Sequence, residues 1–193
     1  MSTRASALAL VLALTPFAVF ADSPFYGEFS AGKATQDSDL SGSPALDGDD
    51  TAVGATLGYQ FSEFLAIELA YTDYGQVQDR NGNSPVTSVS TTGYGINARV
   101  SLPINDTFSL FGKIGLIESE IEQESQFMFN GTTIFTNDTD SDRNVISSGG
   151  ARIMLTDHAY ITLSVSWFDH DVDSGPGFTT EVTNTAIAFG TFF

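Results

Sequence analysis

The chain has 193 residues, of which 24 are acidic and only 7 basic, so its net charge at pH 7 is −17. Nucleic-acid binding needs clustered cations to contact phosphates, and this charge balance therefore excludes a nucleic-acid partner. Cysteine is absent, which excludes disulfides and thiolate metal sites.

The first segment, residues 1–21, has the composition of a secretory signal peptide. A single basic residue, Arg4, precedes an apolar run from Ala5 to Phe20. This run is shorter than the roughly 20 residues that a helix needs to cross a bilayer. We therefore expect residues 1–21 to be removed after export, which leaves residues 22–193 as a single domain without a cofactor.

After residue 21, segments of about ten residues alternate apolar with small or polar residues, which is the period of a β-strand. In each segment one face is apolar, as with Leu57 and Leu69, and the other carries mainly Gly, Ser, Thr and the few charges. Eight strands are predicted on this basis, at 25–32, 51–61, 64–74, 93–102, 108–116, 143–155, 161–167 and 184–193.

The connections between these segments are alternately long and short. The short ones are 62–63, 103–106 and 156–158, and the long ones, which we expect to be loops, are 34–50, 75–87, 120–142 and 170–180. Strict alternation is typical of a membrane barrel, in which short turns face the periplasm and long loops face the outside. A soluble β-sandwich has no reason to follow this rule.

Aromatic residues are placed as in the two interfacial girdles of a membrane barrel. Those near the short turns are Phe61, Phe64, Phe108 and Phe193, and those near the long loops are Tyr71, Tyr74, Tyr94 and Trp167. Since no later apolar run is long enough for a membrane helix, a closed barrel is the remaining way to span a bilayer. The fold class predicted is all-β: an eight-stranded antiparallel up-and-down transmembrane β-barrel.

Five ionisable residues fall within the predicted strands, all on the small and polar face: Glu28, Glu68, Arg99, Lys113 and Arg152. A charge that faced lipid at mid-membrane would cost roughly 2–4 kcal/mol, so this face is expected to be the interior. An eight-stranded barrel is just wide enough for side chains to fill it. The five residues lie at similar depth, and we expect them to form an interior ion network; the alternative is a gate in a narrow pore.

Three segments of the chain resemble the small OmpA-like and OmpX-like outer-membrane barrels: Phe25–Phe29, Leu57–Gly75 and the terminal strand. The resemblance covers residues 22–193 and implies export through the periplasm to the bacterial outer membrane, among its lipid and lipopolysaccharide. It also implies a salt-bridged interior.

In this family an apolar pattern ending in Phe resembles the signal that the barrel-assembly machinery reads. Ile187, Phe189 and Phe193 fit that pattern, whereas Thr191 replaces the usual aromatic residue.

Most of the acidic residues fall in the long connections, where only Lys33, Arg80 and Arg143 oppose them. Such a field attracts cations, and carboxylate oxygens are the ligands that hard divalent ions prefer. The run that begins at Asp138 does not complete a calcium loop, because Arg143 stands where glycine is required. We expect a solvated acidic surface and assign no metal site, with bound divalent ions as the alternative.

The third long connection contains the strongest short hairpin signal, an Asn-Gly pair at 130–131 between two apolar runs. The apolar members of these runs are Phe127, Phe129, Ile134 and Phe135. An exposed apolar hairpin favours pairing with another chain or surface. The alternative is that its phenylalanines fold back over the barrel mouth.

The predicted function is a structural or adhesion-like role, carried by the acidic extracellular loops toward an extracellular surface or protein partner. A narrow pore for ions or small solutes is the first alternative. A lipid A-modifying enzyme is the second, and it would need a polarised histidine near a serine or an acid. His158 lies in an expected periplasmic turn, and His170 stands between Asp169 and Asp171 with Ser174 nearby. We assign no catalytic residues.

Overall fold

The computed structural model describes residues 23–39, 46–79, 86–129, 132–172 and 178–193, and at the hairpin tips, such as 123–129 and 132–138, it describes strand pairing only. The predicted signal peptide lies outside the described residues. The strands are β1 (Phe25–Asp39), β2 (Leu46–Ser62), β3 (Leu65–Asp79), β4 (Val86–Pro103), β5 (Phe108–Phe129), β6 (Thr132–Met154), β7 (Ala159–Val172) and β8 (Phe178–Phe192). Within the described residues no helix is long and apolar enough to cross a membrane.

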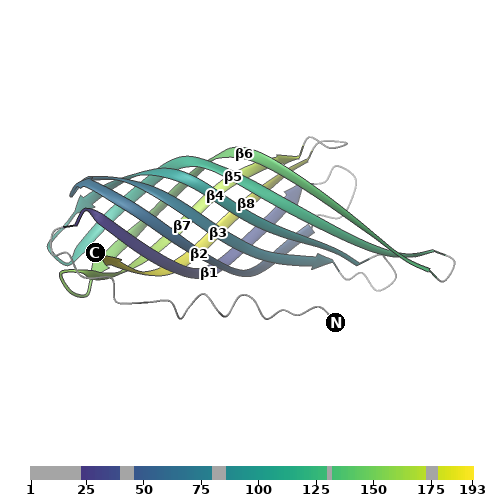
Figure 1. Cartoon of the computed structure of the whole chain (residues 1–193), viewed down its shortest axis with the longest axis horizontal. Helices are drawn as coiled ribbons and strands as arrows, with labels where there is room; N and C mark the ends of the chain where they lie inside the picture. Colours follow the sequence, from purple (N-terminus) through teal and green to yellow (C-terminus); the bar gives the residue numbers. More distant parts are fainter. Residues whose placement is uncertain (1–22, 40–45, 80–85, 130–131, 173–177) are drawn as a thin grey trace.

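The eight strands form one closed antiparallel barrel in which every strand pairs with its neighbours in sequence and β1 closes on β8. Figure 1 shows the strands inclined to the long axis of the molecule, as closure of a sheet requires. Glu28 of β1, for example, lies opposite Thr56 on β2 and Gly190 on β8. The predicted fold class is confirmed.

The two faces of each strand are assigned as the alternation predicted. Large apolar side chains point outward, and Leu57, Leu69 and Val100 are about 60% exposed. A soluble protein rarely exposes a continuous apolar surface of this extent. The inward positions, such as Glu68 and Arg99, are almost completely buried. This arrangement is the one expected where the outer surface contacts lipid.

The short connections lie together at one end of the barrel, which we call the turn end. Side chains replace missing backbone partners there: Asn105 Oδ1 accepts hydrogen bonds from the N–H groups of Thr107 and Phe108. Thr156 Oγ1 does the same for His158 and Ala159. These contacts explain why polar residues occupy the turns.

The long connections differ from the prediction, because most of their residues belong to strands. β1 continues to Asp39, β3 to Asp79 and β5 to Phe129, and β6 already begins at Thr132. The apolar alternation ends where the lipid contact ends, but antiparallel pairing still satisfies the backbone in water. Loss of the apolar pattern therefore marks the end of the lipid contact and not the end of a strand.

The girdle prediction is wrong for Tyr74. The sequence placed it in an interfacial girdle, but its side chain points into the barrel, is 2% exposed and packs against Phe168 with ring centroids 5.4 Å apart. Its position has the same parity as Glu68 and Thr72, which face inward. Tyr71, Tyr94 and Trp167 lie on the outward faces of β3, β4 and β7, and their side chains are about half exposed.

The wall of the barrel is not continuous at the end away from the turns. β6 pairs with β7 only from Ser147 to Met154, whereas it pairs with β5 from Thr132 to Ile153. Within the described strands, the β6–β7 ladder thus leaves out residues 132–141 and 143–146 of β6, which pair with β5 alone. Figure 1 shows the β5–β6 hairpin reaching further than the other hairpins. We call residues 117–146 the β5–β6 extension.

Near the turn end, Gly58 makes room for the Tyr26 side chain, which lies across the inner face of β2. Tyr26 lies opposite Gly58, which in turn lies opposite Glu68 on β3. A Cβ atom on Gly58 would lie 2.1 Å from Cζ of Tyr26. The Tyr26 ring can therefore pack against β2 only because residue 58 has no side chain.

We predict that Gly58→Ala lowers the thermal unfolding midpoint in detergent, because the completely buried Tyr26 ring has no free space into which to move. Overpacking of this kind costs about 1–3 kcal/mol. The measurement is the temperature at which the folded form disappears in heat-modified gel mobility. Gly112→Ala is the control, because its added Cβ would face outward with its nearest neighbour 3.9 Å away. Equal midpoints for the two variants would contradict the prediction.

Candidate functional site

The five interior charges come from five different strands and form one alternating array. Arg99 Nη1 lies 3.2 Å from Glu28 Oε1 and 3.2 Å from Glu68 Oε1. Lys113 Nζ lies 2.6 Å from Glu68 Oε2, and Arg152 Nη2 lies 3.5 Å from Glu28 Oε1. The order is thus Lys113, Glu68, Arg99, Glu28, Arg152, with a cation at each end. The structure brings together all five residues that the sequence grouped.

Each carboxylate of the array separates two cations. Lys113 and Arg99 are direct cross-strand partners, an unfavourable pairing for like charges. Glu68 binds both of them and is itself 1% exposed. Burial strengthens the attraction between these charges but also imposes a desolvation cost, so the array gives little net stability compared with an apolar core. Its main consequence is specificity, since losing one member leaves another charge uncompensated.

Aromatic residues that the sequence analysis did not single out support the array. The Tyr26 hydroxyl donates a 2.7 Å hydrogen bond to Glu68 Oε1. The Arg99 guanidinium lies 3.9 Å from the ring centroid of Phe111, and that of Arg152 lies 4.1 Å from that of Tyr160. All three aromatic residues have inward parity. Aromatic residues on an otherwise small and polar face were the signal that could have revealed them.

Apolar layers lie above and below the array within the barrel. Toward the turn end, Tyr26, Ala66 and Tyr160 form a buried cluster with Met154 and Phe192 packed against it. Toward the opposite end lies a second cluster: Ala34, Ala52, Tyr74, Ile117, Ile146, Phe168 and Val182. Strands β1, β3, β5 and β6 each contribute one residue to the array and one to this second cluster. On each of these strands the cluster residue lies further from the turn end than the array residue. This second cluster therefore separates the charges of the array from the end of the barrel that carries the β5–β6 extension.

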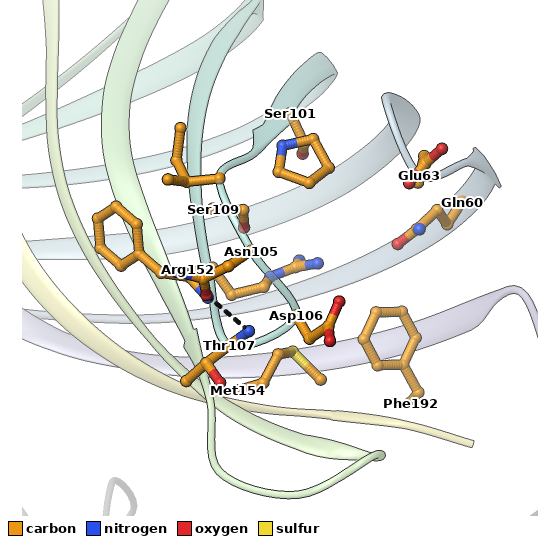
Figure 2. A pocket seen from close by; sticks show the side chains of 13 residues that line it. Gln60, Glu63, Ser101, Asn105, Asp106, Thr107, Ser109, Arg152, Met154 and Phe192 are labelled. Atoms are coloured by element: carbon orange, nitrogen blue, oxygen red, sulfur yellow. Dashed lines mark hydrogen bonds between the residues drawn. The ribbon is translucent and has the colours of Figure 1, made fainter.

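A cavity of about 370 Å³ at the turn end reaches the array at one residue, Arg152. Figure 2 shows the Arg152 side chain reaching from β6 among the other lining residues, which include Asp106 and Phe192. Glu63 lines the cavity at its exposed rim. The cavity is therefore acidic at its edge and basic where it meets the interior.

The remaining predicted residues lie elsewhere. Ile187 and Phe189 face outward on β8, and the Phe193 N–H donates to the carbonyl of Phe25. Phe127 pairs with Ile134 in the β5–β6 ladder, while Phe129 and Phe135 belong to the same ladder. The Asn-Gly turn and the side chains of these four residues lie outside the described residues. The alternative in which the phenylalanines cover the barrel mouth stays a prediction.

No group of three histidine or acidic side chains gathers as a metal site in the part of the chain that the structure describes. Several acids of the long connections, among them Asp37, Asp39, Asp47 and Asp138, have side chains outside that part. Asp49 is described and pairs with Lys33 at 2.9 Å, with both side chains well exposed. Asp50 Oδ2 accepts a hydrogen bond from the N–H of Gln76 and so joins β2 to β3.

We predict that Arg99→Met lowers the free energy of unfolding, because it removes the only cation shared by both carboxylates. Breaking a buried ion pair costs about 3–5 kcal/mol. The control is Arg143→Met, which removes a 2.9 Å pair with Glu118 whose arginine side chain is 70% exposed, and such surface pairs contribute about 0–1 kcal/mol. Denaturant titration of both variants in detergent is the measurement, and a loss no larger for Arg99→Met than for the control would count against a coupled array.

Comparison with solved structures identifies similar barrels. Neisserial surface protein A has a TM-score of 0.64 at 12% sequence identity, covering 89% of this chain and 98% of that one. OprG of Pseudomonas aeruginosa has a TM-score of 0.57 at 15% identity, with 89% and 98% covered. Ail of Yersinia pestis, in complex with the heparin analogue sucrose octasulfate, has a TM-score of 0.51 at 12% identity, with 86% and 98% covered. At these identities the likeness shows the fold alone.

No curated protein matches the chain at a significant level. The family model of the OmpA-like transmembrane domain, however, matches residues 21–185, which is most of the sequence. This match agrees with the closed barrel, the apolar outer surface and the charged interior. The chain therefore belongs to the OmpA-like transmembrane domain family and is an eight-stranded barrel of the bacterial outer membrane.

Proposed function

We propose that the protein is a surface-interaction protein whose binding element is the β5–β6 extension. The observation that carries this proposal is that, in the described strands, residues 132–141 and 143–146 of β6 pair with β5 and not with β7. In a barrel of this class the short turns face the periplasm, which places the extension outside the cell. A long strand edge presented there is available to a partner.

An unpaired edge carries a row of backbone donors and acceptors that can add another strand. Strand addition obtains affinity from main-chain hydrogen bonds and specificity from alternate side chains. The apolar residues that the sequence concentrates at 127–135 would supply part of that specificity. Natural proteins usually protect such edges, so an edge left open along this length is consistent with use in binding.

The charge of the extension limits the kind of partner. Glu118, Glu120 and Glu122 lie on the outward side of β5, and Arg143 already pairs with Glu118. A field of this sign repels polyanions and attracts cationic or neutral polypeptides. The Ail structure contains a sulfated ligand, and we infer that this chain has a different, less anionic partner. We propose a polypeptide on an extracellular surface.

The interior supports a structural barrel more than a pore or an enzyme. Arg99, Glu68, Tyr26 and Tyr160 are each at most 1% exposed and fill the barrel around the array. His158 lies in a turn, where its backbone N–H donates a hydrogen bond to Thr156 Oγ1. The side chain of His170 lies outside the described residues. We therefore propose that the protein neither conducts solutes nor modifies lipid A.

We further propose that residues 1–21 direct export and that residues 22–193 form the mature barrel. Ile187 and Phe189 point outward at alternate positions near the chain end, as a signal for the barrel-assembly machinery would require. Outer-membrane lipid and lipopolysaccharide then surround the apolar outer face.

We expect no steady single-channel conductance when the purified barrel is inserted into planar bilayers, because side chains of the array and of both apolar layers obstruct the interior. A porin of known conductance, inserted under the same conditions, is the positive control. Regular conductance steps from the barrel would contradict a filled interior and favour the pore.

Shortening the extension is expected to abolish attachment. The variant replaces residues 121–140 by Asn-Gly, which joins Glu120 to its ladder partner Ser141, removes most of the open edge and keeps the register. Attachment of expressing cells to immobilised matrix proteins and to cultured epithelial cells should then fall to the level of cells without the gene.

The matched control shortens another hairpin by the same method. Replacing residues 38–46 by Asn-Gly joins Asp37 to its partner Asp47 at the tip of β1 and β2, and attachment should persist. Heat-modified gel mobility verifies that both variants fold. Full attachment by the β5–β6 variant, or equal loss in both, would be evidence against the extension as the binding element.

A further inference from the structure

We infer that the cavity at the turn end binds a small monocarboxylate, whose negative charge pairs with the Arg152 guanidinium. This site is separate from the β5–β6 extension and lies at the opposite end of the barrel. The inference combines the charge of the array, the incomplete pairing of Arg152, the access route and the chemistry of the lining.

The array has one positive charge more than it has negative charges. Its three cations face two carboxylates, and no other charged side chain contacts them within the described residues. An uncompensated charge in a buried site is costly, since water screens it poorly there. A bound monovalent anion would make the array neutral.

Arg152 is the cation of the array with the longest ion pair and with access to the cavity. Its contact with Glu28 is 3.5 Å long and is the longest in the array. The same Glu28 oxygen also accepts from Arg99 at 3.2 Å, and Arg152 Nε has no hydrogen-bond partner; Arg99 likewise has two unpartnered nitrogens, Nε and Nη2, but it does not line the cavity. Lys113, at the other end of the array, is 2.6 Å from its carboxylate. Arg152 is also the only cation of the array that lines the cavity, so an anion that enters there meets its guanidinium group.

An anion would reach Arg152 from the turn end alone. The cavity that contains Arg152 is lined by the connection between β4 and β5 and by the ends of β6 and β8. Above the array, the apolar cluster around Tyr74 and Phe168 fills the barrel. The site is therefore exposed to the periplasmic side, where the short turns of such barrels lie.

The lining selects among anions. Glu63 and Asp106 at the rim repel a multivalent anion more strongly than a monovalent one, because the Coulomb energy rises with charge. Met154 and Phe192 offer apolar contacts to a short carbon chain. With about 370 Å³ of space, the cavity accommodates an acid of a few carbons, and its chemistry disfavours phosphate.

The test measures the thermal unfolding midpoint of the full mature barrel in an uncharged detergent with sodium propionate, chloride or phosphate at equal ionic strength. A ligand that binds only the folded state raises the midpoint, and we expect a saturable shift of roughly 3 °C with propionate alone. A second readout follows the Arg152 Nε–H signal by NMR, which should move as propionate is added.

Variants on the same strand separate this site from a general salt effect. Arg152→Gln should abolish the propionate shift, and Arg143→Gln, on the exposed part of β6, should retain it. Glu28→Gln removes the competing carboxylate and should lower the propionate concentration at half-saturation. If Arg152→Gln does not fold, Arg152→Lys keeps the charge without the fork and should weaken binding several-fold.

A saturable effect of propionate that depends on Arg152 would support the site. The inference is wrong if wild-type protein shows no propionate shift, if chloride or phosphate acts equally, or if Arg143→Gln loses the effect as well. None of these outcomes depends on whether the β5–β6 extension binds a partner.

Discussion

Hydrocarbon offers the backbone no hydrogen-bond partners, and most of this structure follows from that constraint. Each unsatisfied N–H or C=O group in the bilayer costs several kcal/mol, so the strands must pair on both sides within the membrane. The β1–β8 ladder removes the two edges that an open sheet would have. Once the wall is closed, alternate residues point to lipid or to the interior, and polar groups are restricted to the inside.

The interior then has to be filled by side chains that tolerate burial. It is organised in layers: aromatic residues near the turns, the ion array above them, and an apolar cluster above the array. The array is held by pairs between strands that are distant in sequence, such as Glu28 with Arg99. A layer of this kind gives a unique register, because a shift of any contributing strand leaves a buried charge unpaired.

The two ends of the barrel meet different surroundings, and their chemistry differs accordingly. Away from the turns, pairing continues beyond the apolar band, and one hairpin presents an acidic face and an open edge. At the turn end, the wall is complete but the interior is accessible through a cavity that ends at Arg152. A closed wall in the membrane therefore permits an open edge outside it, since only there can water satisfy the unpaired backbone groups.

The sequence alone determined the strand number, the face of each residue and the interior position of the five charges. These properties depend on a local two-residue period and on the cost of placing charge in lipid, and both can be evaluated along a single strand. The tertiary structure decided the pairing order within the array, the length of the strands beyond lipid and the incomplete β6–β7 ladder. Those features depend on the stagger between strands and on contacts across the barrel, which no single segment encodes. Local alternation specifies which side of the wall a residue occupies, and only closure specifies its neighbours.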